Sequence, residues 1–307
     1  MPHVSARVVA FALSISALVL VLLVTGSDTP SATSPGPTAG DAEPTSTLPR
    51  WATSPTLSWA PPELDDPETI SVSTEPDAIK LDPDRDYRIE LPSSPVTRPV
   101  AIDGGRNVVL IGGEIAIPWQ GEEPYASQRR GLLLRDQTGV VHVEGLLIRG
   151  EDVSEGIQID AEDATVQLQS IRIENLHARD QVDFSDNHPD VVQPYGGVDE
   201  LRIDRLTGET DYQGLFLAED LGPIGSVDLR RVNIRSTETA RYLLWASGTF
   251  PLSVQEVYAD PAPGRSWDKT VRGGERWAAA EPGRPADGDF VTSDDAGIGY
   301  RGPGYVE

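Results

Sequence analysis

The stretch VQLQSIRI, residues 166–173, decides the fold of this chain. Its first apolar residues alternate with polar ones, and a period of two residues is typical of a β-strand with one buried face. The same rhythm returns in VVLIGGEI (108–115), VHVEGLLI (141–148), LRIDRLTG (201–208) and VDLRRVNI (227–234). A spacing of about 25 to 35 residues between such segments indicates stacked units rather than one globular core.

In each of these five segments, the first two apolar residues are predicted to point into a shared interior. The pairs are Val108/Leu110, Val141/Val143, Val166/Leu168, Leu201/Ile203 and Val227/Leu229. Gly112 and Gly145 follow two of the pairs, where the chain is expected to bend.

A second series of strands precedes four of these segments: GLLLRD (131–136), GIQIDA (156–161), VVQPYG (191–196) and GLFLAE (214–219); YLLWAS (242–247) follows the last. The pairs expected to point inward are Leu132/Leu134, Ile157/Ile159, Val192/Pro194, Leu215/Leu217 and Leu243/Trp245. The side chains between and after them are expected to form two outward rows. One row is Leu133, Gln158, Gln193, Phe216 and Leu244, and the other is Arg135, Asp160, Tyr195, Ala218 and Ala246.

The repeat, the opening segment GGRNVVLIGGEI (104–115) and the D-x-x-Q of HPDVVQ resemble the right-handed parallel β-helix of the pectate-lyase-like superfamily, over about residues 85–260. The resemblance implies an all-β solenoid. We expect an N-terminal cap over 63–100, because an open end of stacked strands exposes edges that must be covered. This superfamily hosts lyases, hydrolases, epimerases, phage adhesins and non-enzymatic surface proteins, so the resemblance does not fix a function.

Four regions follow from the patterns along the chain. Residues 1–26 contain a long apolar run after Arg7 and are read as a signal peptide or an N-terminal membrane anchor, with both alternatives open. Residues 27–62 are rich in Pro, Ser and Thr and are predicted to be a disordered linker. The β-helix domain with its cap covers 63–261, and a loop-rich wrap covers 262–307, with Trp267, Trp277 and Tyr300 as expected packing anchors across the last coil. Both readings of the leader place the protein outside the cytoplasm, and membrane contact is expected only through it.

The composition excludes several classes of function. A net charge of -24 disfavours nucleic acid and anionic membranes as partners, because binding phosphate needs a basic surface. The absence of cysteine excludes disulfides, thiol nucleophiles and thiolate metal sites.

The stretch SDNHPDVVQPYGG, residues 185–197, is the strongest candidate for chemistry. His188 and Asp190 lie just before the Gln193 strand, where a histidine can act as acid or base near neutral pH. Asp160 with Asp190 is the predicted pair of catalytic carboxyls, which a glycosidase holds about 5 to 9.5 Å apart. The predicted substrate-binding residues are Gln158, Gln193, Tyr195, Tyr212, Gln213, Phe216 and Arg135, because sugar hydroxyls need paired donors and acceptors and sugar C–H faces stack on rings.

Each of these assignments has a simpler structural alternative. Gln158 and Gln193 could form an amide ladder in which neighbouring side chains satisfy each other. Residues 180–190 could be only a long corner loop, in which Asn, Asp and Pro serve turn geometry. No cofactor is required by the pattern; four carboxylates in this loop, Asp183 and Asp186 among them, would suit Ca²⁺, although their spacing is not that of an EF-hand.

The pattern departs from the known enzymes of this fold. The N-x-D, D-D and R-x-K elements of pectin hydrolases are not present as a set, and the region lacks the clustered lysines of pectate lyases. We therefore expect a protein that binds a polysaccharide or cell-wall glycan, with two alternatives left open. One is a polysaccharide hydrolase or lyase, and the other is a non-catalytic glycan-binding or structural surface protein. The oligomeric state is not predicted.

Overall fold

The computed structural model describes residues 56–122, 126–178, 189–238 and 240–306, all inside the compact unit Thr47–Glu307. The apolar run of the predicted leader, and the linker as far as residue 55, lie outside the described residues. Within the described ranges, no helix has the length and apolar character to cross a membrane.

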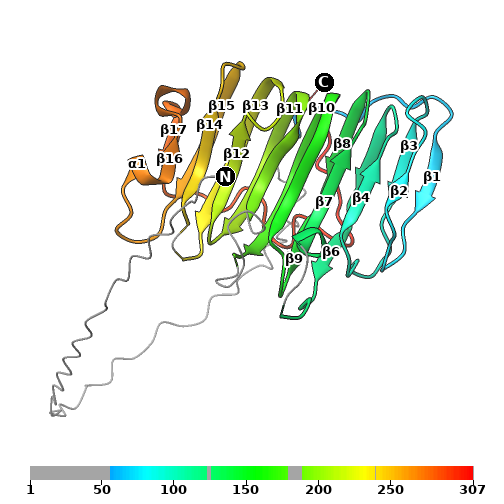
Figure 1. Ribbon diagram of the computed structural model, residues 1–307, viewed down its shortest axis with the longest axis horizontal. Helices are drawn as coiled ribbons and strands as arrows, with labels where there is room; N and C mark the ends of the chain where they lie inside the picture. Colours follow the sequence, from blue (N-terminus) through cyan, green and yellow to red (C-terminus); the bar gives the residue numbers. More distant parts are fainter. Residues whose placement is uncertain (1–55, 123–125, 179–188, 239, 307) are drawn as a thin grey trace, which may run out of the picture. The chain divides into compact units, whose positions relative to one another are not determined.

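The described chain is 52% strand and 5% helix, which confirms the predicted all-β class. Its strands join one large parallel sheet that is compatible with a β-helix (Figure 1). The pairings fall into three ladders, in which each strand pairs with a strand of the next turn of the chain.

The first ladder contains the segments that opened the sequence analysis. In order, its members are β1 (Glu68–Ser71), β3 (Tyr87–Glu90), β5 (Val108–Ile111), β8 (Val140–Glu144) and the middle parts of β10 (Glu155–Leu176), β11 (Asp190–Thr210) and β13 (Ile224–Ser236), ending at β15 (Leu252–Asp260). The second ladder runs through β2 (Ile79–Lys80), β4 (Val100–Asp103), β7 (Arg130–Arg135), the starts of β10 and β11, β12 (Gln213–Ala218), β14 (Tyr242–Ser247) and β16 (Val271–Arg272).

The third ladder runs through β6 (Glu114–Ile117), β9 (Leu147–Gly150), the later parts of β10, β11, β13 and β15, and β17 (Ala280–Pro282). The short helices η2 (Ala126–Arg129), α1 (Trp267–Thr270) and η4 (Gly274–Trp277) lie between strands. Strands β1 to β3, in the region expected to be a cap, pair in parallel as the first members of the first and second ladders.

The predicted inward pairs of the first ladder are confirmed. Val108, Val141, Val166, Leu201 and Val227 are consecutive partners in register, and each is at most 2% exposed. Each fully buried side chain of this size contributes about 1.5–3 kcal/mol of hydrophobic stabilisation. The rows continue from strand to strand, so one continuous core forms that no single turn of the chain could bury alone.

A residue in the left-handed region, followed at the first bend by Gly113 with φ 98°, turns the chain from the first ladder into the third. These residues are Gly112, Gly145, Ser170, Arg205, Arg231 and Glu256, with φ between 50° and 72°. The two glycines are those that the sequence analysis placed at bends. The other four positions carry Ser, Arg or Glu, for which this conformation is less favourable, so stacking of the neighbouring turns must hold it.

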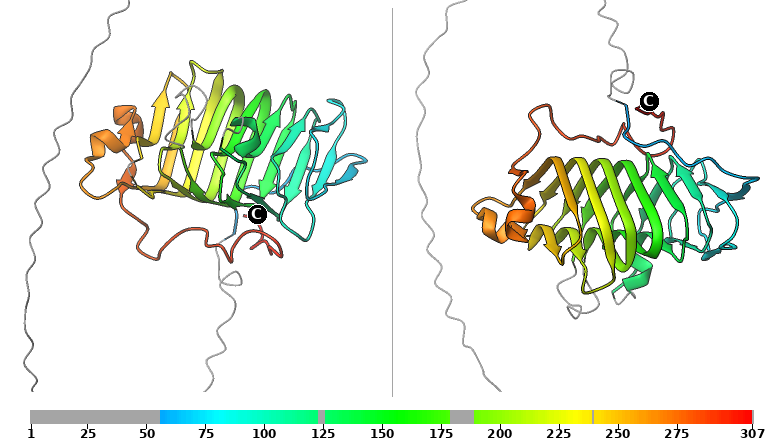
Figure 2. Two further views of the ribbon diagram at one scale, coloured as in Figure 1. Left: turned by 60° about the horizontal axis from the view of Figure 1, so that its bottom comes forward. Right: turned by 90° about the horizontal axis from the view of Figure 1, so that it is seen from above.

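Residues 289–306, here called the strap, run back along the outside of the sheet (Figure 2). Trp277, an expected anchor, is buried at the end of the strands. Tyr300 instead packs beside Gly145, where a Cβ atom would lie 2.2 Å from its ring. Near its end, the strap forms a parallel bridge from Tyr305 to Leu57. The wrap therefore does not only close the last turn: it also covers turns in the middle of the sheet.

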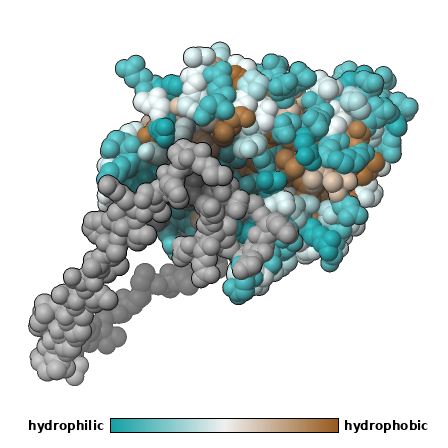
Figure 3. Space-filling model, viewed as in Figure 1, coloured by the Kyte–Doolittle hydropathy of each residue, from teal (hydrophilic) through white to brown (hydrophobic). Residues whose placement is uncertain are grey.

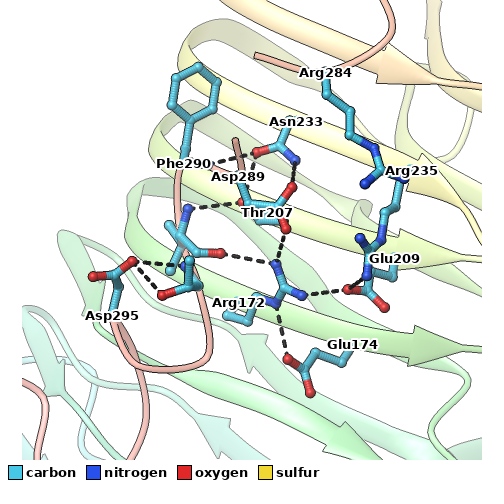
Figure 4. A network of polar contacts seen from close by, with 12 residues as sticks. Arg172, Glu174, Thr207, Glu209, Asn233, Arg235, Arg284, Asp289, Phe290 and Asp295 are labelled. Carbon is cyan, nitrogen blue, oxygen red and sulfur yellow. Dashed lines mark hydrogen bonds and ion pairs between the residues drawn. The ribbon is translucent and has the colours of Figure 1, made fainter. Parts of the chain in front are cut away.

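Arg172 holds the start of the strap to the third ladder (Figure 4). Its guanidinium donates hydrogen bonds to Asp289 at 2.8 Å and to the Val291 carbonyl at 3.0 Å. It also forms ion pairs with Glu174 and Glu209 from its own and the next turn.

Candidate functional site

The outer face of the second ladder carries one continuous row of side chains, here called the amide–aromatic row. It consists of Leu133, Gln158, Gln193, Phe216, Trp245 and Arg272, which the strand registers place side by side in this order. The six side chains come from six successive turns of the chain, and neighbouring strands lie about 4.8 Å apart. Figure 3 shows apolar patches between hydrophilic side chains on the face seen in Figure 1.

Aromatic rings form the C-terminal half of the row. The Phe216 and Trp245 ring centroids are 4.5 Å apart, and the Tyr242 ring meets Trp245 at 5.4 Å in a T-shaped contact. The Arg272 guanidinium lies 4.0 Å from the Trp245 ring centroid, which is a cation–π distance. Phe216 and Trp245 remain partly exposed, so their rings can take a flat apolar surface.

Amides form the N-terminal half of the row. Gln158 and Gln193 are 7% and 6% exposed, and they are direct partners in register. Within the described part of the chain, the buried oxygen Oε1 of Gln158 has no hydrogen-bond partner, and neither does Nε1 of Trp245. Such atoms are unusual, because buried polar atoms almost always find partners.

Asp190, at the start of β11, is the most perturbed acid near the row. It stands two residues before the buried Val192, so it shares the inward side of the strand rather than the side of Gln193. It is 1% exposed, and neither of its carboxylate oxygens has a hydrogen-bond partner among the described residues. Burial raises the pKa of Asp190 well above its usual value, and the negative charge of Glu155 raises it further. Desolvation also raises the pKa of Glu155, against the opposing effect of its ion pair with Arg130. Both carboxyls stand two residues before the registered pair Ile157 and Val192, so they are neighbours across two turns.

The predicted pairing of Asp160 with Asp190 is not what the structure shows. Asp160 lies five residues after Glu155 in β10 and is in register with Gly197. At about 3.3 Å per residue, this places it about 16 Å along the strand from the Asp190 end, beyond the spacing of glycosidase carboxyls. The carboxyl beside Asp190 is Glu155, which the sequence analysis did not select.

A bulge and a one-residue offset explain the other differences. The register shifts between Gln158 and Asp160, so Tyr195 does not face Asp160; it is 51% exposed. Leu244, expected outside, is fully buried, whereas Trp245, expected inside, stands in the outer row. Leu243 and Leu244 are adjacent and both buried, as are Val191 and Val192 at the equivalent positions of β11. Two adjacent apolar residues at the start of the strand are therefore the sequence signal for this offset.

The remaining predicted residues are divided between this face and its surroundings. Gln213 is in register with Asp190, and the ring of Tyr212 lies 5.1 Å from the Arg241 guanidinium. Arg135 forms an ion pair with Asp103 in the neighbouring turn. Three residues, His188, Asp183 and Asp186, lie outside the described residues. In the described ranges, no three His, Asp or Glu side chains are placed to hold a metal ion.

A second cluster that contains a histidine lies under the strap. His142 Nε2 is 2.9 Å from Glu144 Oε2, and the hydroxyls of Tyr300 and Tyr305 donate to the same carboxylate at 2.9 and 2.7 Å. Burial acts to raise the pKa of Glu144, but these hydrogen bonds outweigh it and the pKa is lowered. Both His142 and Glu144 are at most 1% exposed, so the cluster anchors the strap rather than offering a site to a ligand.

Comparison with protein-family models, with curated proteins and with solved structures gives no match for this chain. The candidate site is therefore argued from its own geometry.

Proposed function

We propose that the chain is a right-handed parallel β-helix, of the pectate-lyase-like type, that binds carbohydrate along the amide–aromatic row. The observation that carries the proposal is the run of Gln158, Gln193, Phe216 and Trp245 on four successive turns. Amides can pair with both the donor and the acceptor of a sugar hydroxyl, and the aromatic rings can stack on its C–H face. The unpartnered Gln158 Oε1 and Trp245 Nε1 would then find their partners in the ligand.

A location outside the cytoplasm is part of the same proposal. The apolar leader and the Pro- and Ser-rich linker of residues 1–62 would hold the domain at a membrane or deliver it beyond one. In both cases the domain would meet polysaccharide or cell-wall glycan.

Cleavage of the bound glycan is a second candidate, favoured by the neighbouring carboxyls Asp190 and Glu155. Two adjacent acids in a desolvated site cannot both ionise easily, so one keeps its proton near neutral pH. A protonated carboxyl of this kind can serve as the general acid that protonates a glycosidic oxygen.

Trp245→Ala is expected to weaken glycan binding about tenfold, because a stacked aromatic contact contributes about 1 kcal/mol or more. Titration calorimetry of the full chain with a panel of neutral and charged oligosaccharides measures the change. Trp119→Ala is the matched control, since Trp119 is 51% exposed and lies outside the row. Equal affinities for wild type and Trp245→Ala would show that the row is not the binding face.

Turnover separates the two candidate functions. If the site cleaves glycan, wild type releases new reducing ends or unsaturated products from a polysaccharide, and Asp190→Asn releases none. If neither protein releases product from any polysaccharide that the wild type binds, the catalytic candidate is wrong and the binding proposal remains.

A further inference from the structure

A groove of about 380 Å³ opens beside the candidate face. Its walls come from three successive turns of the chain: the segment after β7, the middle of β10 and the bend in β11. The lining residues are Asp136, Gln137, Thr138, Asp160, Ala161, Glu162, Asp163 and Gly196.

The groove lies beside the amide half of the amide–aromatic row, farther along the same strands. Asp160 follows Gln158 by two residues in β10, and alternate residues of a strand share a face. Gly196 follows Gln193 by three residues and packs directly on Asp160, since a Cβ atom there would lie 1.6 Å from Asp160 Oδ1. A polymer bound on the row at Gln158 would therefore have the groove about 7 Å to its side, along the strand.

The carboxylates of the groove lack basic partners. No ion pair joins Asp136, Asp160, Glu162 or Asp163 to an Arg or Lys of the described residues. Arg135 on β7 is in register with Asp160, but its guanidinium forms its ion pair with Asp103, which also receives Lys80. Arg135 is therefore the one basic neighbour of Asp160 in register, and its charge is already shared with another carboxylate.

A buried amide in the wall also points to a ligand that donates hydrogen bonds. Gln137 is 1% exposed, and its Nε2 donates to the carbonyls of Ile102 and Gly104 at 2.9 and 3.0 Å. These two bonds use both hydrogens of the amide nitrogen. Within the described part of the chain, Oε1 has no hydrogen-bond partner. All these groups accept hydrogen bonds, and a buried acceptor without a donor costs about 1–3 kcal/mol.

We propose that this groove binds the ammonium group of an amino sugar, so that the glycan recognised by the adjacent row is a cationic polymer with free amines. The inference rests on the proposed carbohydrate-binding function and names its ligand class. An ammonium group brings three donors and a positive charge, which match four carboxylates and an amide oxygen. The net charge of -24 attracts such a polymer and repels one built of uronates. No set of three acids here is placed to hold a metal ion, which favours an ammonium group over a metal.

The test compares soluble β-1,4-linked glucosamine oligomers with their fully N-acetylated counterparts, using the full chain. Wild type is expected to bind the amine form about tenfold more tightly, since two exposed charge contacts supply roughly that factor. The double variant Asp160→Asn with Asp163→Asn is expected to bind both oligomers equally. Asp77→Asn with Asp287→Asn is the matched control: both acids are exposed, neither lines the groove, and the net charge changes by the same amount.

Three outcomes separate the groove from the row. Loss of the amine preference in the groove variant alone supports the inference. If the preference for the amine form persists in the groove variant, or falls equally in the control, the groove is not the ammonium site. The proposed function still holds in that case if the protein binds the acetylated oligomer and Trp245→Ala weakens this binding. If wild type binds neither oligomer, the inference fails, and the proposed function fails with it when the wider oligosaccharide panel is also not bound. Melting temperatures of all variants check that each is folded.

Discussion

Arg172→Met is expected to lower the free energy of unfolding by about 3 kcal/mol, because removing one partner of a buried ionic network leaves the others uncompensated. Arg172 is 8% exposed by side chain and meets Glu174, Glu209 and Asp289 (Figure 4). Burial acts to lower the pKa of Arg172, but the carboxylates around it outweigh this effect and raise it. The charged guanidinium is thus the form that the folded protein favours.

The loss should also free the strap, since Arg172 contacts Asp289 and the Val291 carbonyl there. Chemical denaturation measures the stability, and limited proteolysis reports cutting within residues 289–306. Arg230→Met is the control, because the Arg230–Asp228 pair is partly exposed and such pairs contribute about 0–1 kcal/mol. Similar losses in the two variants would show that the network has no special role in holding the strap.

Asp190→Asn is expected to stabilise the protein at pH 7 by about 2 kcal/mol, because the neutral amide carries no charge to bury and an unsatisfied buried charge costs this order of free energy. The folded-state pKa of Asp190 is raised by desolvation and by Glu155, so the folded protein holds the proton more tightly than the unfolded chain. Stability from this group is present below the unfolded pKa, near 3.8, and is lost as the pH rises towards the folded pKa. The asparagine side chain does not titrate, so the variant does not lose this stability as the pH rises. Its advantage should therefore be near zero at pH 4 and grow towards pH 7.

Asp204→Asn tests the same chemistry with the opposite sign. Asp204 is also fully buried, but it is ion-paired with Arg231 and accepts a hydrogen bond from the Ser58 amide at 2.8 Å. The substitution removes a satisfied charge, so it is expected to destabilise the fold by about 2–3 kcal/mol. Denaturation curves for both variants across pH 4 to 7 provide the comparison. Destabilisation by Asp190→Asn at pH 7 would mean that the carboxylate has a favourable partner in the folded protein.

Much of the candidate face could be predicted from the sequence, because the alternation of side chains along a strand depends only on neighbouring residues. The alternation around Gln158 and Gln193 placed both amides on the outer face, and the register confirms that they are neighbours. Phe216 was placed correctly in the same way. The prediction of the row was wrong at its next member, because it counted the last strand from Tyr242. Tyr242 is in register with Gln213, so Leu244 lies beside the inward Leu215 and Trp245 beside Phe216. A period of two residues cannot show where a strand begins, and a start that is one residue early reverses the predicted face of every side chain.

The sequence by itself determined the all-β class, the inward residues of the first ladder and the glycine bends. Each depends on how one residue relates to its near neighbours along the chain. Only the tertiary structure decided that Glu155 rather than Asp160 lies beside Asp190, and that the strap seals His142 and Glu144. These contacts join residues from different turns of the chain, where a bulge, a register shift or a returning segment sets the distance. Such contacts leave no periodic signal in the sequence, because their geometry depends on every turn that lies between them.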